Sequence, residues 1–297
     1  MKMHAASINP SDLVFMRGSY GFAPREGVIP GLEGSGEIIA CGKGLAPRLF
    51  LGRRVACTPL VGEDGTFASH MITSVGNLVP LLPSLSYEEG ASLIVNPLSA
   101  WLLLSKVREL NSHTILVTVS TGALGTMLVR LGKSLGYTII GVVQKNEHVQ
   151  GVKSAGASEV LVKNDPGFLN NLREMCHRYQ TRVALDGAAG ETTSLVVKAM
   201  PKGSTIILYG SLGGNAMELD ASDFIFSDIS LVGFWLYHFT RSASRMNMAK
   251  TFYTVQKKVK KELATPVFAT YPLHSINEAI ACYLENRTQG KVILTME

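Results

Sequence analysis

Uninterrupted apolar runs alternate with segments of helical periodicity between residues 114 and 236. Six runs predict buried strands, at residues 114–119, 138–143, 159–163, 183–188, 204–210 and 229–236. Apolar residues that recur every three or four positions predict helices between them, at 126–136, 147–156, 168–179 and 191–200. Strands without polar interruption that alternate with helices are typical of a parallel, doubly wound sheet. We therefore predict an α/β fold with a Rossmann dinucleotide-binding domain over residues 98–238.

The flanking segments follow a different pattern. Residues 1 to about 95 carry short apolar runs separated by glycine and proline, which predict closely spaced strands. Ser86, followed by two glutamates, is expected to cap a helix. Beyond residue 239 we expect a long polar helix, a strand, a second helix and a closing strand over KVILTM. The first segment is too broken by glycine to be self-contained, so we predict a single β-rich domain built from residues 1–97 and 239–297.

Composition narrows the class of protein. The 297 residues are 46% hydrophobic and 17% charged, with 29 glycines, as in a well-packed α/β protein. We expect no membrane span, because no apolar stretch reaches about 18 residues. The start, MKMHAASINP, lacks the apolar core of a signal peptide, which makes the cytoplasm the expected compartment. The four cysteines lie far apart without a C-x-x-C pair, which argues against a disulfide framework or a structural zinc site.

The net charge of +5 does not by itself indicate which partners the protein binds. The densest basic run, Lys257 to Lys261, lies in a polar helical segment, and we interpret it as a solvated face. No aromatic residues are interleaved with it, so we expect no nucleic-acid partner. A basic surface is nevertheless compatible with a small anionic, phosphate-bearing substrate.

The turn after the first strand of the alternating region has the spacing of a dinucleotide-binding loop. Gly122 and Gly125 hold the second and third glycine positions of G-x-G-x-x-G, and Ser120 replaces the first glycine. Alone such a turn can serve packing only, but the strand before it and the helix after it favour a cofactor site. We expect the hydroxyl or the amide of Ser120 to face a cofactor phosphate. The candidate cofactor-binding residues of this turn are Ser120, Thr121, Gly122, Ala123, Leu124 and Gly125.

The end of the second strand indicates which nicotinamide cofactor is used. NAD sites place an acid there to bind the ribose 2′-hydroxyl, whereas this chain has Gln144, Lys145 and Asn146. A carboxylate would repel a 2′-phosphate and Lys145 would attract one. We therefore predict NADPH, with Gln144 and Lys145 at the site. The alternative is that Lys145 only points into solvent.

Several motifs together resemble the medium-chain dehydrogenase/reductase superfamily. They are INPSDL, GSYG, PGLEGSGEI, VNPLSAW, the glycine turn and the closing GKVIL, and they cover essentially the whole chain. Zinc-dependent members carry a cysteine near INPSDL and a histidine in G-H-E, whereas this chain has Asn9-Pro10-Ser11-Asp12 and Gly31-Leu32-Glu33. We therefore expect no catalytic metal. The resemblance implies a GroES-like catalytic domain around the Rossmann domain. Because family members begin with a further strand-and-hairpin segment, the GroES-like domain is expected to be N-terminally shortened.

Within that superfamily, four motifs resemble the mitochondrial-type 2-enoyl thioester reductases: INPSDLVFMRGSYG, VNPLSAW, YGSLGG and GFWLYHF. The quinone reductase branch shares INPSD and often G-x-Y. The resemblance implies that Tyr20 assists protonation or holds the substrate, and that Asn96 lies near the active site. It also implies that the cofactor is bordered by Tyr209, Gly210, Phe234 and Trp235, with Lys291 of GKVIL as a further candidate.

These observations lead to one expected activity and two alternatives. Reducing a conjugated thioester needs a hydride at the β-carbon, a donor to the enolate oxygen and a proton at the α-carbon; Tyr20 and Asn96 are suitable donors. We expect an NADPH-dependent 2-enoyl thioester reductase, acting on a CoA or acyl-carrier substrate. The alternatives are an NADPH quinone or enone reductase and a non-catalytic NADPH-binding protein. We expect a homodimer that pairs through residues 229–236. A mitochondrial location is the alternative for a eukaryotic chain with an incomplete N-terminus.

Overall fold

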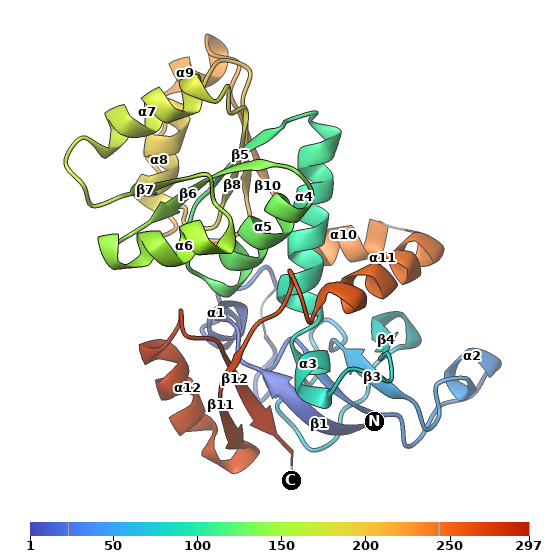
Figure 1. The fold of residues 1–297 in the computed structure, drawn as a ribbon. Coiled ribbons are helices and arrows are strands. Elements are labelled where there is room, and N and C mark those ends of the chain that lie inside the picture. Colours follow the sequence, from blue (N-terminus) through green and yellow to red (C-terminus); the bar gives the residue numbers. More distant parts are fainter. Residues whose placement is uncertain (23, 243, 297) are drawn as a thin grey trace. The chain divides into compact units, whose positions relative to one another are not determined.

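The chain forms two compact units. The computed structural model describes residues 1–22, 24–242 and 244–296. One unit comprises Met1–Leu98 with Ser244–Glu297, and the other comprises Ser99–Ala243. Each unit contains its own six-stranded sheet (Figure 1). The chain therefore leaves the first unit, builds the second, and returns to complete the first.

The sheet of the second unit is entirely parallel. Its strands are β5 (Thr114–Val117), β6 (Thr138–Val143), β7 (Glu159–Val162), β8 (Val183–Asp186), β9 (Thr205–Leu208) and β10 (Ser230–Gly233). Their order is β10-β9-β8-β5-β6-β7, so the winding direction reverses between β5 and β8. In such sheets ligands bind beyond the carboxyl ends of the strands at this reversal. The Rossmann prediction is confirmed.

Helices cover this sheet and supply its core. They are α4 (Ser99–Glu109), α5 (Ala123–Ser134), α6 (Val149–Ala155), α7 (Phe168–Arg178), α8 (Gly190–Ala199), α9 (Ala221–Ile225) and α10 (Leu236–Ser242), with a 3₁₀ turn at Asn146–His148. Phe168 and Leu172 of α7 and Val196 of α8 are buried against strand residues such as Ile140. Each such side chain contributes about 1.5–3 kcal/mol when it is fully buried.

Five of the six strands of this sheet are shorter than the apolar runs predicted, among them β5 and β10. β5 ends at Val117, because Val119 adopts a left-handed conformation with φ 53° and turns the chain toward α5. β10 ends at Gly233, and the apolar residues that follow it enter α10 from Leu236 onward. The last three residues of the predicted strand 229–236 therefore lie outside β10: Phe234 and Trp235 form the connection, and Leu236 begins α10.

The sheet of the first unit joins both ends of the chain. Its strands are β1 (Lys2–Ser7), β2 (Gly34–Glu37), β3 (Arg54–Cys57), β4 (Leu78–Pro80), β11 (Val267–Pro272) and β12 (Lys291–Thr295). Their order is β11-β12-β1-β2-β3-β4. Only the β11–β12 pair is parallel, and β12 pairs with β1 so that Leu294 lies opposite Ala6. This sheet corresponds to the β-rich part of the predicted fold.

The helices of the first unit are short apart from α11. They are α1 (Pro10–Met16), α2 (Leu45–Arg48), α3 (Tyr87–Ala91), α11 (Arg245–Lys258) and α12 (Ile276–Glu285), with 3₁₀ turns at Val75–Asn77 and Leu273–Ser275 and a π-helical turn at Ile94–Leu98. The predicted cap is confirmed: Ser86 Oγ accepts from the amide of Glu89, whose carboxylate accepts from the Ser86 amide. No helix within the described ranges is long and apolar enough to cross a bilayer.

Asp12 gives the first unit a testable pH dependence. Its carboxylate is fully buried and accepts hydrogen bonds from the amides of Asn9 and Leu32, at 2.7 and 2.8 Å. Burial is the main cause that raises the pKa of Asp12 from 3.8 to about 7, and the two backbone bonds oppose it. Glu33 raises this pKa further, and Lys291 lowers it. Between the two values the folded chain retains a proton that the unfolded chain releases.

We therefore expect the free energy of unfolding to fall as pH rises from about 4 to about 7. The full shift corresponds to about 4 kcal/mol, at 1.36 kcal/mol for each pKa unit. Urea unfolding of the wild type and of Asp12→Asn across this window measures the effect. The variant should show a flatter pH profile, and equal slopes in the two proteins would contradict the assignment to Asp12.

Candidate active site

The predicted glycine turn connects β5 to α5. Gly122 precedes the helix, which begins at Ala123. A Cβ atom on Gly125 would lie 2.1 Å from the carbonyl oxygen of Val119, so only glycine lets the helix approach this turn. A Cβ atom on Gly122 would meet its nearest neighbour at 3.5 Å, an ordinary contact. The protein itself does not require a glycine at 122, and its absent side chain leaves the turn open to a ligand.

Ser120 is placed differently from our expectation. It is fully buried, its hydroxyl donates to the carbonyl of Val117 at 2.7 Å, and it accepts from the amide of Val142 at 3.1 Å. The Ser120 amide donates to the carbonyl of Val142 at 3.1 Å. Both polar groups expected to face a phosphate thus join β5 to β6 inside the fold. The neighbouring residues Thr121, Gly122, Ala123 and Leu124 are half-buried and remain accessible.

A buried carboxylate lies at the reversal point of the sheet, where the sequence reasoning had not placed a functional residue. Asp186 ends β8 and is fully buried. It accepts from the hydroxyls of Thr118, at 2.6 Å, and of Thr193, and from the amide of Ala188 at 2.8 Å. These bonds join the carboxyl ends of β5 and β8 to the start of α8. An acid that closes an otherwise apolar run, as in VALDGA, was the available signal.

Tyr209 and Gly210 lie at the same edge, directly after β9. The Tyr209 amide donates to the carbonyl of Asp186 at 2.8 Å. A Cβ atom on Gly187 would lie 2.7 Å from the Tyr209 ring, and one on Gly210 would lie 2.9 Å from the Gly187 carbonyl oxygen. Burial, together with the charge of Asp186, raises the pKa of Tyr209, so its phenol stays neutral. The structure therefore brings Tyr209 and Gly210 to the reversal point that carries the glycine turn.

Gln144 and Lys145 follow β6 and are exposed. Lys145 Nζ lies 3.6 Å from Glu147 Oε1, with side chains 67% and 64% exposed. Glu147 also lies 3.5 Å from His148 Nε2. Ion pairs this exposed contribute about 0–1 kcal/mol, so an anion that approached Lys145 would displace Glu147 readily. Sequence reasoning noted the missing acid at the strand end but did not weigh this glutamate.

Phe234 and Trp235 stand at the carboxyl end of β10. Together with Leu208, Gly233, His238 and Phe239 they line an open hollow of about 440 Å³. The Trp235 ring lies edge-on to that of His238, with centroids 4.9 Å apart, and the rings of Phe234 and Phe239 are also 4.9 Å apart. This aromatic surface belongs to the same edge of the sheet as Tyr209.

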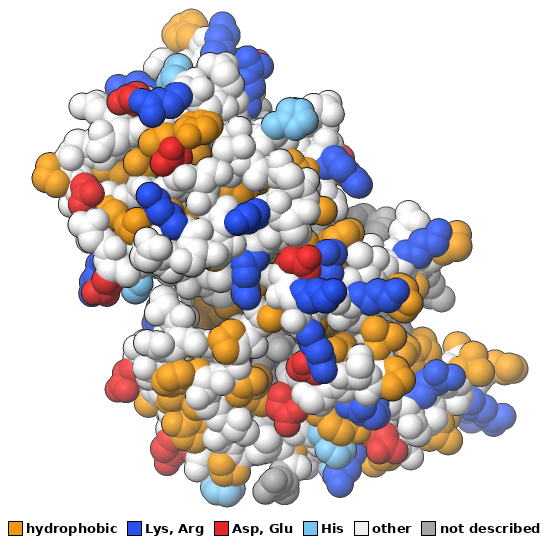
Figure 2. Space-filling view, viewed as in Figure 1, with side chains coloured by type: hydrophobic (Ala, Val, Ile, Leu, Met, Phe, Trp, Pro, Cys, Tyr) orange, Lys and Arg blue, Asp and Glu red, His pale blue; other side chains and the backbone are white. Residues whose placement is uncertain are grey.

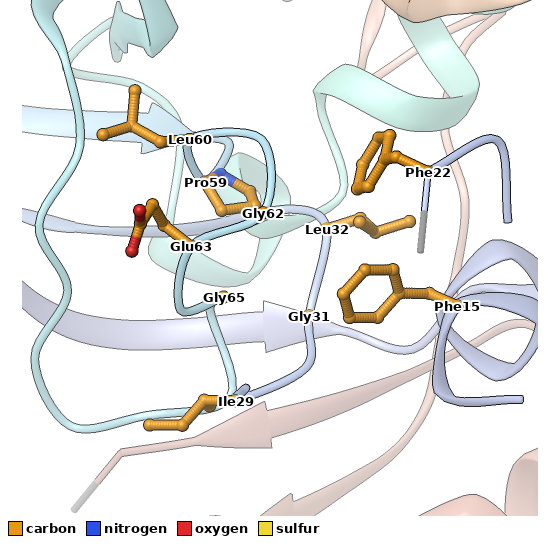
Figure 3. Close-up of a pocket in the computed structure, with 10 residues that line it drawn as sticks. All are labelled: Phe15, Phe22, Ile29, Gly31, Leu32, Pro59, Leu60, Gly62, Glu63 and Gly65. Carbon is orange, nitrogen blue, oxygen red and sulfur yellow. The ribbon is translucent and has the colours of Figure 1, made fainter. Parts of the chain in front are cut away.

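Tyr20 belongs to the first unit and follows α1. Its ring lies edge-on to Phe22 and Phe15, with centroid distances of 5.2 and 6.4 Å. Figure 3 shows Phe15 and Phe22 beside Leu32 at a narrow apolar pocket. The free space in it is about 10 Å³, enough for about one water molecule. Leu32 of the Gly31-Leu32-Glu33 motif contributes an apolar wall to this pocket.

Asn96 lies in the π-helical turn Ile94–Leu98, which also contains Pro97. Its side chain is 8% exposed. No hydrogen bond to the Asn96 carboxamide is found among the residues that the structure describes. Single π-helical turns are rare and occur frequently at functional sites.

Lys291 is placed inside the first unit. It is 3% exposed, and its ammonium group donates to Asn9 Oδ1 and lies 3.4 Å from Ser7 Oγ and 3.5 Å from Glu33 Oε1. The cation is therefore held by acceptors of its own unit, which differs from its expected role in binding the cofactor. Within the described part of the chain, no three side chains of the histidine, cysteine, aspartate or glutamate type are grouped as metal ligands.

Comparison with known proteins places the chain in a family. Residues 1–84 match the model of the alcohol dehydrogenase GroES-like domain, and residues 123–253 match that of the zinc-binding dehydrogenase. The chain is 26% identical to the human mitochondrial enoyl-[acyl-carrier-protein] reductase over 308 residues, covering 100% of this chain and 80% of that protein.

Solved structures agree with these matches. The putative NADPH:quinone reductase of Mesorhizobium loti is 30% identical, with a TM-score of 0.93 over 99% of this chain and 86% of its own. The complex of Etr1p with NADP and crotonyl-CoA shares the fold, with 22% identity, a TM-score of 0.80, and coverage of 99% and 90%.

The Rossmann unit inserted into a GroES-like unit defines a dehydrogenase/reductase architecture. The chain belongs to the medium-chain dehydrogenase/reductase superfamily, and its residues at positions 9 and 32 assign it to the zinc-independent members. It is accordingly an oxidoreductase.

Proposed function

We propose that the protein reduces the carbon–carbon double bond of a 2-enoyl thioester with NADPH and without zinc. The observation that carries this proposal is the set of polar side chains in the first unit. Tyr20 and Asn96 offer a phenol and a carboxamide, both neutral hydrogen-bond donors, while the zinc-ligand positions hold Asn9 and Leu32. The similarity to enoyl reductases supports the same reading. Neutral donors aimed at a developing enolate are sufficient catalysts without a metal.

The second unit fits a dinucleotide. Gly122 leaves the turn open, Gly125 allows the close packing of α5, and the first amides of α5 form an anion-binding helix N-terminus. The residues that would hold the cofactor are the turn 121–125, Lys145, Tyr209, Gly210, Phe234 and Trp235. When bound, NADPH supplies the hydride for the β-carbon. Asp186 stabilises this edge of the sheet by accepting hydrogen bonds from the hydroxyls of Thr118 and Thr193.

The first unit supplies the polar steps. In the proposed reaction the Tyr20 hydroxyl and the Asn96 carboxamide donate hydrogen bonds to the thioester oxygen, and these bonds strengthen as the enolate forms. We also assign to the Tyr20 hydroxyl the role of assisting proton delivery to the α-carbon. The aromatic hollow of the second unit suits an apolar part of the reactants.

Lys145 provides a test of cofactor choice. Lys145→Glu replaces a cation beside the proposed 2′-phosphate with an anion next to Glu147. We expect the affinity for NADPH to fall about 10-fold or more, while the affinity for NADH changes little or rises, because only NADPH carries the phosphate. Titration of protein fluorescence with each cofactor measures this difference.

The matched control is Lys153→Glu, which makes the same charge change on the exposed face of α6. It should leave both affinities within about twofold, since Lys153 lies in the last turn of α6 and is not among the proposed cofactor residues. The role of Lys145 would be contradicted if Lys145→Glu bound NADPH as tightly as the wild-type protein does.

We also infer a homodimer through β10. This strand is the edge of its sheet, and its residues Ser230 and Val232 are exposed. An unpaired edge strand offers a row of amide and carbonyl groups to a second copy. Light scattering coupled to size-exclusion chromatography should give twice the chain mass, and a monomer mass at micromolar concentration would contradict the inference.

The substrate class is tested by comparing acceptors in parallel. NADPH oxidation is followed with crotonyl-CoA and with a simple benzoquinone under the same conditions. Consumption of crotonyl-CoA supports the thioester reductase. Consumption of the quinone alone favours the second candidate, a quinone or enone reductase, which the Mesorhizobium loti relative supports. NADPH binding without turnover of either compound would support a non-catalytic NADPH-binding protein.

A further inference from the structure

Glu33 is a fully buried carboxylate that joins four segments of the first unit. One oxygen, Oε2, accepts from the amides of Ile94 and Val95 at 3.0 and 2.8 Å. The other oxygen, Oε1, accepts from Ser7 Oγ at 2.6 Å and from Asn9 Nδ2 at 2.9 Å. Oε2 therefore has two donors, and Oε1 has three when Lys291 Nζ at 3.5 Å is included, so the two oxygens serve different parts of the fold.

The amides bound by Oε2 are those that a helical turn leaves without partners. Ile94 and Val95 are the first two residues of the π-helical turn, and the initial amides of a helix have no acceptor within it. A carboxylate satisfies them with charge-assisted bonds, which are about twice as strong as neutral ones. Glu33, which lies 61 residues before Ile94, thus holds the beginning of the turn that carries Asn96.

Lys291 balances the buried charge. Its ammonium lies 3.5 Å from Glu33 Oε1, and it also donates to Asn9 and lies near Ser7. The Glu33 and Lys291 side chains are 0% and 4% exposed. A buried charge without a partner is strongly unfavourable, and the Lys291 ammonium is the buried cation that faces the Glu33 carboxylate.

We propose that Glu33 is a positioning residue for Asn96. Asn96 directly follows Val95, and its carboxamide has no hydrogen bond of its own among the described residues, so its direction follows from the backbone that carries it. The Glu33 carboxylate fixes the two preceding amides and thereby that backbone. The proposal rests on the proposed function, in which the Asn96 carboxamide donates to the substrate carbonyl.

Glu33→Gln tests this role with almost no change of shape. The glutamine side chain has one acceptor oxygen and one NH2 donor group. It therefore leaves either the two amides of the turn or the donors Ser7 and Asn9 without an acceptor. We expect kcat with crotonyl-CoA to fall about 100-fold, as for loss of an aligned oxyanion donor, while the Kd for NADPH stays within about twofold. Hydrogen exchange of the peptide that contains residues 94 and 95 should become faster.

A double-mutant cycle separates positioning from general damage. In an Asn96→Ala background, Glu33→Gln should cause no further loss of kcat, because the group that it positions is gone. The matched control is Thr66→Val, which removes a buried 2.9 Å bond to the Glu33 backbone carbonyl and leaves the carboxylate intact. It should keep kcat within about threefold and leave exchange at residues 94 and 95 unchanged.

The proposal is overturned if Glu33→Gln lowers kcat by the same factor with and without Asn96, or if exchange at residues 94 and 95 does not change. If the single variant does not fold, the double variant Glu33→Gln with Lys291→Gln removes both buried charges together and carries the same expectations. A wild type that leaves crotonyl-CoA untouched would refute the proposed thioester reduction. The exchange measurement then still decides whether Glu33 holds the turn, so the two failures are distinguishable.

Discussion

Gly125→Ala is expected to lower the affinity for NADPH about 100-fold and to destabilise the second unit. The added Cβ would lie 2.1 Å from the Val119 carbonyl oxygen and 2.9 Å from Ser120 Cα, both backbone atoms that cannot rotate away. The turn or the start of α5 must shift, and overpacking of this kind destabilises by about 1–3 kcal/mol. A shift that moves the helix amides off a phosphate removes a similar amount of binding free energy, at 1.4 kcal/mol for each factor of ten.

Gly122→Ala distinguishes an effect on NADPH binding from an effect on folding stability. Its Cβ would meet only ordinary contacts at 3.5 Å, and its φ of −68° suits alanine, so thermal unfolding should be close to that of the wild type. The methyl group would nevertheless occupy the opening proposed for the pyrophosphate, and the affinity for NADPH should fall about 10-fold or more.

Calorimetric titration and thermal unfolding of both variants provide the measurements, with Gly151→Ala as a control. Gly151 lies in α6 with nothing within 4 Å of its added Cβ, so this variant should bind normally and be slightly more stable. If Gly122→Ala bound NADPH as tightly as the wild type, the proposal that this turn binds the cofactor would be wrong.

The Rossmann sheet could be predicted because burial on both faces leaves a direct trace in the sequence. After an initial threonine, strands such as TILV and TIIGVV contain no polar residue that a one-sided sheet would expose. The exact end of β5 could not be predicted, because Val119 is β-branched and such residues rarely adopt a left-handed conformation. This turn is also the reason that Ser120 points inward, where its hydroxyl bonds to both neighbouring strands.

The sequence could propose candidate site residues only where a local motif contained them. Gly122 and Gly125 belong to one short turn, and the structure shows why position 125 admits no side chain. Glu33 and Lys291 are 258 residues apart, and no spacing rule joins them before β12 pairs with β1. Lys291 therefore looked like a cofactor ligand in its motif, although the structure uses it to balance a buried carboxylate.

Tyr20→Phe is expected to reduce kcat for crotonyl-CoA about 100-fold or more. The phenylalanine keeps the edge-on contacts with Phe22 and Phe15, so the change removes only the hydroxyl. In the proposed reaction that hydroxyl stabilises the enolate oxygen and assists protonation, and single groups in either role are worth about 10²–10³-fold. The Kd for NADPH should stay within about twofold, since the residues proposed to hold the cofactor belong to the other unit.

Steady-state and single-turnover kinetics, together with cofactor titration, measure these effects. Tyr253→Phe is the matched control, because Tyr253 is 50% exposed on α11 of the same unit and should be replaceable without loss. If Tyr20→Phe retained wild-type kcat, the phenol would have no part in the chemistry. A loss of kcat that appears only in steady state, and not in a single turnover, would assign Tyr20 to product release, because chemistry and release are separated by these two measurements.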